Sequence, residues 1–229
     1  PLIAMIVAFG ITSQMKPQWE ATGVMQIGQV GPTPQPVEPV TRVVERMKMT
    51  TFADGVLASI GVQLKDADYR ASLYRDSLKT KLLPNTDLIE VKVRGHSLEE
   101  ARDNIEATAA YLRAIHDRMA GSSIEQMKRH LTRVIQQMES SRAARDDLTS
   151  MAEMRQKPHS GDHFMANVEL ANMLMKREAE LRDLEQAKTA IEEQLSPLHT
   201  YPTALIDTIH VGENPVAPNI LRISVLSGL

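Results

Sequence analysis

Cysteine is absent from the 229 residues of this chain. Its absence excludes disulfide bonds, cysteine–zinc sites and thiol catalysis, and it fits a periplasm and a cytosol equally well. Aromatic residues make up only 3% of the chain, and the net charge of -3 gives no bulk attraction to nucleic acid or anionic lipid. The core must therefore be packed from aliphatic residues and the 13 methionines, a profile that favours long helices over a β-sandwich.

Long apolar runs are also missing, since residues 2–11 and 220–226 are the longest and neither reaches the ~20 residues that span a bilayer. Both runs lie at the ends of the sequence. They are either short core segments, or a signal-peptide remnant in the case of the first run, or stubs of two transmembrane helices. We expect the stubs, over residues 1–13 and 220–229, with a single domain over residues 14–219 between them.

Period-two alternation and turn residues predict three β segments. Residues 21–30 are β-prone, and the four prolines within residues 32–39 then require an extended chain, which we expect to be a surface excursion. Residues 78–94 alternate apolar and charged side chains around the turn at residues 84–87. This pattern predicts a hairpin with one buried and one wet face. Residues 205–211 are the last β-prone run.

Helical periodicity predicts two helices before the hairpin and two long ones after it. Residues 40–60 form the first helix, with Gly61 as its terminator, and residues 66–74 form a short second one. Ser97 and Glu100 form a capping box that starts the third helix.

The apolar seam of this third helix runs from Leu98 to Met119 and slips at residues 121–123. The slip turns the seam by about 200° on a helix of ~100° per residue. The first half of the helix should therefore face the sheet, and the second half should face another helix. That partner is the helix expected over residues 164–195, whose seam is Leu170, Leu174, Leu181, Leu184, Ile191 and Leu195.

The predicted fold is α+β. A small mixed sheet with helices forms a base beside the membrane, and a long antiparallel helical hairpin, the arm, covers about residues 97–196. A straight helix over residues 97–154 would be ~87 Å long, whereas a compact domain of this size has a radius of gyration of ~17 Å. We therefore expect the arm to project or to pack against identical copies.

No catalytic, cofactor-binding or metal-binding constellation emerges from the sequence. His159 and His163 have the i, i+4 spacing of metal ligands, but they straddle a turn glycine. Glu99 and Glu100 are explained by capping and by the helix dipole. The two glycines within residues 28–31 are too weak a signal for a nucleotide site. We expect no enzymatic activity and no cofactor.

Two polar segments remain as candidate sites. One lies in a polar gap of the third helix and is either a solvated face or a contact between subunits or with an acidic glycan; it consists of Arg142, Arg145, Asp146 and Asp147. The other precedes the second apolar run and is either a plain linker or a rigid coupler between the last strand and the membrane, because proline fixes φ. It consists of Asn214, Pro215, Pro218 and Asn219.

Four segments in order carry a resemblance to a known family. They are Trp19-Glu20-Ala21, then Leu88-Ile89-Glu90-Val91-Lys92-Val93 after Asn85-Thr86-Asp87, then Glu100-Ala101 with Asn104 and Tyr111, and finally Asn214-Pro215-Val216-Ala217-Pro218-Asn219. The ordered set covers nearly the whole chain and resembles the chain-length determinants, the Wzz-type polysaccharide co-polymerases. The proline segment at residues 32–39 departs from the family pattern.

The resemblance implies a bacterial inner-membrane protein with cytoplasmic termini and a periplasmic α/β base with a helical arm. It implies a closed homo-oligomeric ring beside a polysaccharide polymerase and its growing lipid-linked glycan. The implied role is non-catalytic: it sets the chain length of O-antigen or exopolysaccharide. One branch of the family continues into a cytoplasmic kinase domain, whereas the modest length here is closer to the O-antigen branch.

Two other functions also fit a helical hairpin. A periplasmic adaptor of an efflux or secretion pump has such a hairpin, but it also has barrel and lipoyl-like domains rich in short strands, for which the about four strands predicted here are too few. The sensor domain of a chemoreceptor lies between two membrane spans, but the strand hairpin and the Pro215–Pro218 segment argue against a simple helical sensor.

Overall fold

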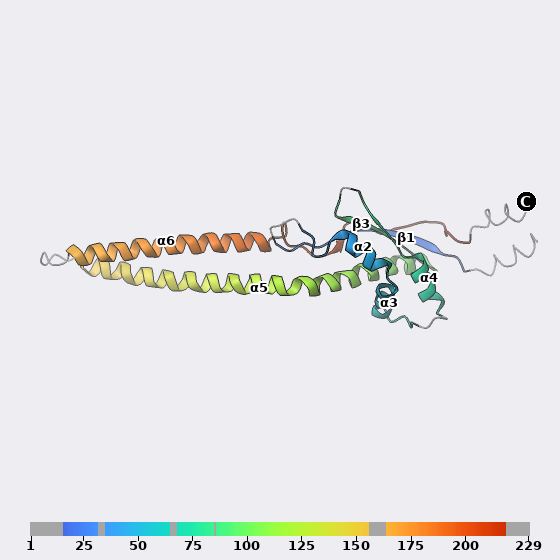
Figure 1. Ribbon diagram of the computed structural model, residues 1–229, viewed down its shortest axis with the longest axis horizontal. Coiled ribbons are helices and arrows are strands. Elements are labelled where there is room, and N and C mark those ends of the chain that lie inside the picture. Colours follow the sequence, from blue (N-terminus) through green and yellow to red (C-terminus); the bar gives the residue numbers. More distant parts are fainter. Residues whose placement is uncertain (1–15, 32–34, 65–67, 85, 156–163, 219–229) are drawn as a thin grey trace, which may run out of the picture. The chain divides into compact units, whose positions relative to one another are not determined.

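The computed structural model describes residues 16–31, 35–64, 68–84, 86–155 and 164–218 (Figure 1). The expected membrane stubs and the turn with His159 and His163 lie outside these ranges. No helix within them is long and apolar enough to cross a bilayer. The chain forms two compact units, one over Pro1–Gln29, Gln35–Met119 and Tyr201–Leu229, the other over Val30–Pro34 and Ala120–Thr200.

The first unit is built on a sheet with the order β2-β3-β1-β4, and β5 also pairs with β1. The strands are β1 (Trp19–Gln26), β2 (Lys79–Leu82), β3 (Leu88–Gly95), β4 (Ala204–Leu205) and β5 (His210–Val211). All four pairings among the described residues are antiparallel. The expectation of a mixed sheet is therefore wrong. The reason is that β3 inserts between β1 and β2, the two strands that run in the same direction.

The predicted alternation is confirmed in β3, where Ile89, Val91 and Val93 are fully buried. It is wrong for Leu82, which is 38% exposed because β2 lies at the edge of the sheet. The run predicted at residues 205–211 is a strand in two pieces. β4 pairs with the end of β1 and β5 with its beginning, and the residues between them leave the ladder.

The first predicted helix is two helices, α2 (Val40–Lys48) and α3 (Thr50–Ser59), because Met49 is extended with ψ 137°. The apolar spacing explains the break. On a straight helix Phe52 would lie about 140° around the axis from Met47, yet both are buried. Gly61, at φ 75°, ends α3 as predicted, and the Val62 amide donates to the Leu57 carbonyl. The next helix, α4 (Tyr69–Ser77), is capped by the Asp68 carboxylate.

The core of the first unit combines β1, β3, α2, α3 and α4 with the first half of α5 (Leu98–Arg155). Ala101, Ile105 and Leu112 of α5 are fully buried in it, as the seam predicts. The ends of that seam are exposed instead, since Leu98 is 47% and Met119 43% accessible. The Tyr74 hydroxyl lies 2.7 Å from Thr108 Oγ1 and ties α4 to α5.

In the second unit the remainder of α5 runs antiparallel to α6 (Phe164–Leu195), as Figure 1 shows. Their shared cluster is Val134, Met138 and Ile191 with Met127, Leu131, Leu184, Ala187 and Leu195. Ser141 donates to Glu180 Oε1 at 3.1 Å. Both the helical pair and the change of seam at residues 121–123 are therefore confirmed.

Candidate functional site

The segment that precedes the second apolar run is paired with the segment that enters β1. The Gln18 amide donates to the Ala217 carbonyl at 2.8 Å, and the Val216 amide donates to the Gln18 carbonyl at 2.7 Å. Arg94 of β3 reaches the same place, with Nη1 3.5 Å from Gln18 Oε1 and Nε 3.2 Å from Glu20 Oε2. The incoming and outgoing segments of the first unit thus form one hydrogen-bonded piece of structure.

The predicted coupler residues surround this bridge. Asn214 and Pro215 are exposed, Pro218 is half-buried, and Asn219 lies outside the described residues. The Ala217–Pro218 peptide bond is cis. Because proline has no amide hydrogen, the segment donates to Gln18 through the Val216 amide, which lies between the two prolines. A coupling role for these residues stays a prediction.

The four charged residues of α5 that the sequence singles out do not gather into one site. Arg145 and Asp146 pair with each other at 2.6 Å, and the side chains of Arg142 and Asp147 are exposed. Such an exposed pair of neighbours contributes little to stability. A role of this cluster in contacts with another subunit or with a glycan stays a prediction.

Glu100 caps the start of α5, with one difference from the predicted box. Its amide donates to Ser97 Oγ at 2.9 Å, as predicted. Its carboxylate, however, accepts from the amide of His96 rather than from that of Ser97, also at 2.9 Å. The other carboxylate oxygen lies 2.9 Å from Arg70 Nε. Glu100 therefore holds α4 and α5 together besides satisfying the helix end.

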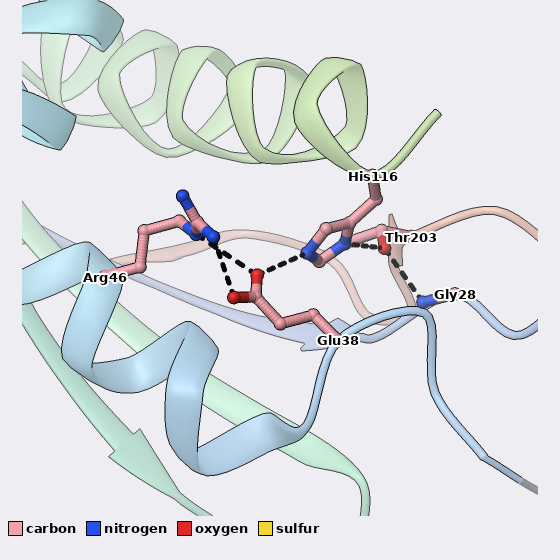
Figure 2. Close-up of polar contacts among 5 residues, drawn as sticks. All are labelled: Gly28, Glu38, Arg46, His116 and Thr203. Carbon is pink, nitrogen blue, oxygen red and sulfur yellow. Dashed lines mark hydrogen bonds and ion pairs between the residues drawn. The ribbon is translucent and has the colours of Figure 1, made fainter. Parts of the chain in front are cut away.

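A buried polar network is the feature that the sequence did not reveal. His116 of α5 is 1% exposed, with Nδ1 2.5 Å from Thr203 Oγ1 and Nε2 3.3 Å from Glu38 Oε2 (Figure 2). Thr203 Oγ1 also accepts from the Gly28 amide at 2.8 Å. Glu38 accepts from Arg46 Nη2 at 2.8 Å and from Nε at 3.1 Å.

One set of proton positions satisfies the whole network. Burial lowers the pKa of His116 below its ordinary 6.5 despite the nearby Glu38 carboxylate, so the imidazole is neutral. Burial raises the pKa of Glu38, but the hydrogen bonds from Arg46 and His116 and the charge of Arg46 outweigh this effect, so the pKa lies below 4.5. The Nε2–H of His116 then donates to the Glu38 carboxylate, and the Thr203 hydroxyl donates to Nδ1.

The hydroxyl, imidazole and carboxylate together resemble a nucleophile–base–acid triad, but the arrangement is unsuited to catalysis. Thr203 is 0% exposed, so a substrate cannot reach its Oγ1. That oxygen also accepts from a backbone amide, which fixes it in place. A triad is defined by geometry and access together. The network therefore links four chain segments, and its role is structural.

Sequence reasoning missed this network because its members are far apart, with 78 residues between Glu38 and His116 and 87 between His116 and Thr203. The expectation that the proline segment is a surface excursion is wrong at Glu38, which is 2% exposed. The Val37 amide also donates to the Gly28 carbonyl at 2.7 Å. The only indication in the sequence that this segment takes part in a network was the carboxylate of Glu38 between Pro36 and Pro39.

Comparison with protein-family models and with curated proteins finds no match. Solved structures do show similarity. A full-length bacterial polysaccharide co-polymerase has 12% identity and a TM-score of 0.34, over 99% of this chain and 87% of that one. A fragment of the polysaccharide co-polymerase WzzB from Salmonella Typhimurium has 10% identity and a TM-score of 0.31, over 88% and 100%.

A lipopolysaccharide O-antigen chain-length regulator of Shigella flexneri has 11% identity and a TM-score of 0.25, over 88% of this chain and 100% of that one. These proteins are named as members of the family that the ordered motifs of this sequence resemble.

Proposed function

We propose that this chain is a polysaccharide co-polymerase, a non-catalytic inner-membrane scaffold that regulates the chain length of a bacterial surface polysaccharide. The polysaccharide is O-antigen or exopolysaccharide, and the scaffold works beside its polymerase. Residues 1–13 and 220–229 lie in the membrane in this proposal, and residues 14–219 lie in the periplasm.

The observation that carries the proposal is that the four segments with the family resemblance meet in one unit. Residues 19–21 and 88–93 are neighbouring strands in register, with Ala21 opposite Val93. Asn104 of α5 donates from Nδ2 to the Arg94 carbonyl at 2.9 Å, and Ala217 of the last segment pairs with Gln18. Motifs that are weak indicators of the family when taken singly therefore lie together in one folded unit.

The bridge between Gln18 and Ala217 suggests how such a body works. The two segments that lead toward the membrane are held together, so a tilt of the base moves both membrane helices as a pair. Arg94 of the inner strand β3 adds an ion pair to Glu20, two residues after Gln18. The arrangement suits a protein that acts through position and contact.

We also propose a closed homo-oligomeric ring, because head-to-tail contacts that close produce rings. The start of α6 offers apolar surface for identical neighbours, since Met165 is 77%, Met173 45% and Met175 59% exposed. Native mass spectrometry of the full-length protein in detergent tests this point. A single monomeric species would contradict it.

Deletion and complementation of the gene test the proposed function. We expect the deletion to replace a narrow polysaccharide length distribution on a gel by a broad one, with total polymer retained, and the intact gene to restore it. Susceptibility to exported drugs is the control for the pump-adaptor alternative. A deletion that changes drug susceptibility and leaves polysaccharide length untouched would favour the adaptor.

A further inference from the structure

Two lysines on neighbouring strands face each other at the edge of the sheet. Lys79 of β2 lies directly opposite Lys92 of β3 in the antiparallel register. Opposed Cβ atoms are ~4.5–5.5 Å apart, and like charges at that distance destabilise a sheet. Lys92 pairs with Glu90 at 3.3 Å, whereas Lys79 and Lys81 have no ion-pair or hydrogen-bond partner within the described ranges.

A groove gathers these charges. It has a volume of about 440 Å³ and is lined by Lys48, Lys79, Lys81 and Lys92 together with Leu78, Thr80 and Glu90. Ligand sites in proteins have volumes of ~300–1,000 Å³. Four ammonium groups and one carboxylate therefore line a concave surface large enough for a sugar unit.

Protection of the sheet edge explains only part of this arrangement. Lysines on an edge strand prevent pairing with another chain, which accounts for Lys79 and Lys81. It does not account for Lys92, which belongs to the inner strand β3, or for Lys48, which comes from the last turn of α2. Cations from three separate elements therefore line one groove. Lys48 and Lys92 have carboxylate partners in Glu45 and Glu90, so the repulsion that an anion would relieve is the one between Lys79 and Lys92.

We propose that this groove binds an acidic sugar unit of the polysaccharide, with its carboxylate between Lys79 and Lys92 and its ring against Leu78. The inference rests on the proposed function, which supplies the glycan. A concave groove favours a narrow chain over a flat membrane surface. Because lysine acts as a point charge on exposed anions, the contact is screened by salt.

Titration of the full chain in detergent with tetragalacturonate tests the proposal, and maltotetraose is the neutral control. We expect the acidic tetramer to bind at low salt and the neutral one not to bind. The K79Q/K92Q variant should bind about tenfold more weakly. The matched control is K128Q/K188Q, which removes the same charge from two helix ion pairs and should bind within about twofold of the parent.

Several results would overturn the proposal. Equal losses in both double variants would mean that bulk charge binds the tetramer, and no binding at low salt would exclude the site. Lysine-dependent binding to vesicles of phosphatidylcholine and phosphatidylglycerol, without binding of the tetramer, would make the groove a membrane contact. Thermal unfolding checks the fold, since K79Q should melt no lower than the parent once the like-charge contact is gone.

The two proposals fail separately. If the deletion strain loses length control but the tetramer does not bind, only the groove is excluded. If the tetramer binds in a Lys79-dependent way and the deletion leaves polysaccharide length unchanged, the proposed function fails and the anion site remains.

Discussion

His116 Nε2 lies 3.3 Å from Glu38 Oε2, and both side chains are buried although 78 residues separate them in the sequence. This contact ties the segment before α2 to the middle of α5. Through the Nδ1 atom of His116 it also reaches Thr203, which precedes β4. The position of the last strands relative to α5 therefore depends on one imidazole.

Replacing this imidazole should destabilise the first unit. His116→Ala removes both contacts and leaves a cavity, so we expect a loss of about 2–4 kcal/mol in the free energy of unfolding. Urea denaturation measures it. His130→Ala, an exposed position on the same helix, is the matched control and should change stability by less than about 0.5 kcal/mol. Equal effects of the two substitutions would show that the network contributes nothing.

The network also predicts how stability depends on pH. Because the pKa of His116 is lowered from 6.5 in the fold, the unfolded chain binds the extra proton first, and stability falls as pH decreases below 6.5. The pKa of Glu38 is also lowered, so its contribution is present above 4.5 and is lost as pH falls through the folded value. His116→Asn should remove the first slope, which is at most about 1.4 kcal/mol per pH unit. Urea denaturation at several pH values between 6.5 and 4.5 measures how the free energy of unfolding changes with pH. An identical change in the parent and in His116→Asn would contradict the prediction.

Two glycines should respond to alanine in opposite directions. A Cβ at Gly28 would lie 2.7 Å from the Thr203 amide nitrogen and 2.9 Å from the Tyr201 carbonyl oxygen, so backbone must move. We expect Gly28→Ala to cost about 1–3 kcal/mol. Gly121 lies inside α5 with open space around it, so Gly121→Ala should stabilise the helix by about 0.5–1 kcal/mol. Thermal melts of both variants against the parent check the two signs.

The packing of α5 against α6 can be tested with two methionines of one helix. Met138 is 5% exposed and Met151 is 50% exposed. Met138→Ala should destabilise the second unit by about 2 kcal/mol or more, because it leaves a cavity. Met151→Ala should be nearly neutral. Hydrogen exchange of the α6 amides reports on this unit directly, and equal exchange rates in both variants would contradict the helical pair.

Local patterns predicted much of this fold because each of them reflects one element. The alternation in residues 88–93 identifies β3, the cap at Ser97 and Glu100 marks the start of α5, and the slip at residues 121–123 separates its two faces. The break at Met49 was missed because the apolar residues on both sides read as one helix. Only their different positions around the axis require two.

Long-range polar contacts could not be predicted in this way. Nothing in the sequence around His116 indicates that Thr203 and Glu38 lie beside it in the fold. The pairing of Gln18 with Ala217 likewise joins opposite ends of the described chain. Lys79 and Lys92 are separate charged positions in the sequence, and only the register of β2 on β3 places them opposite each other.

The Pro215→Ala/Pro218→Ala variant tests whether the segment that precedes the second apolar run couples the base to the membrane. The substitutions restore two amide hydrogens and loosen φ. The fold should persist because Pro215 is exposed and Pro218 half-buried, and neither belongs to the core. Pro84→Ala/Pro197→Ala, at two exposed positions outside this segment, is the matched control.

The decisive measurement is the length distribution of the surface polysaccharide on a gel, from cells that carry each variant at equal protein level. We expect a broadened or shifted distribution with total polymer near that of the parent for Pro215→Ala/Pro218→Ala, and the parental distribution for the control. An unchanged distribution in the first variant would contradict the coupling. Loss of all polymer in a folded, membrane-inserted variant would contradict the claim that the protein sets length only.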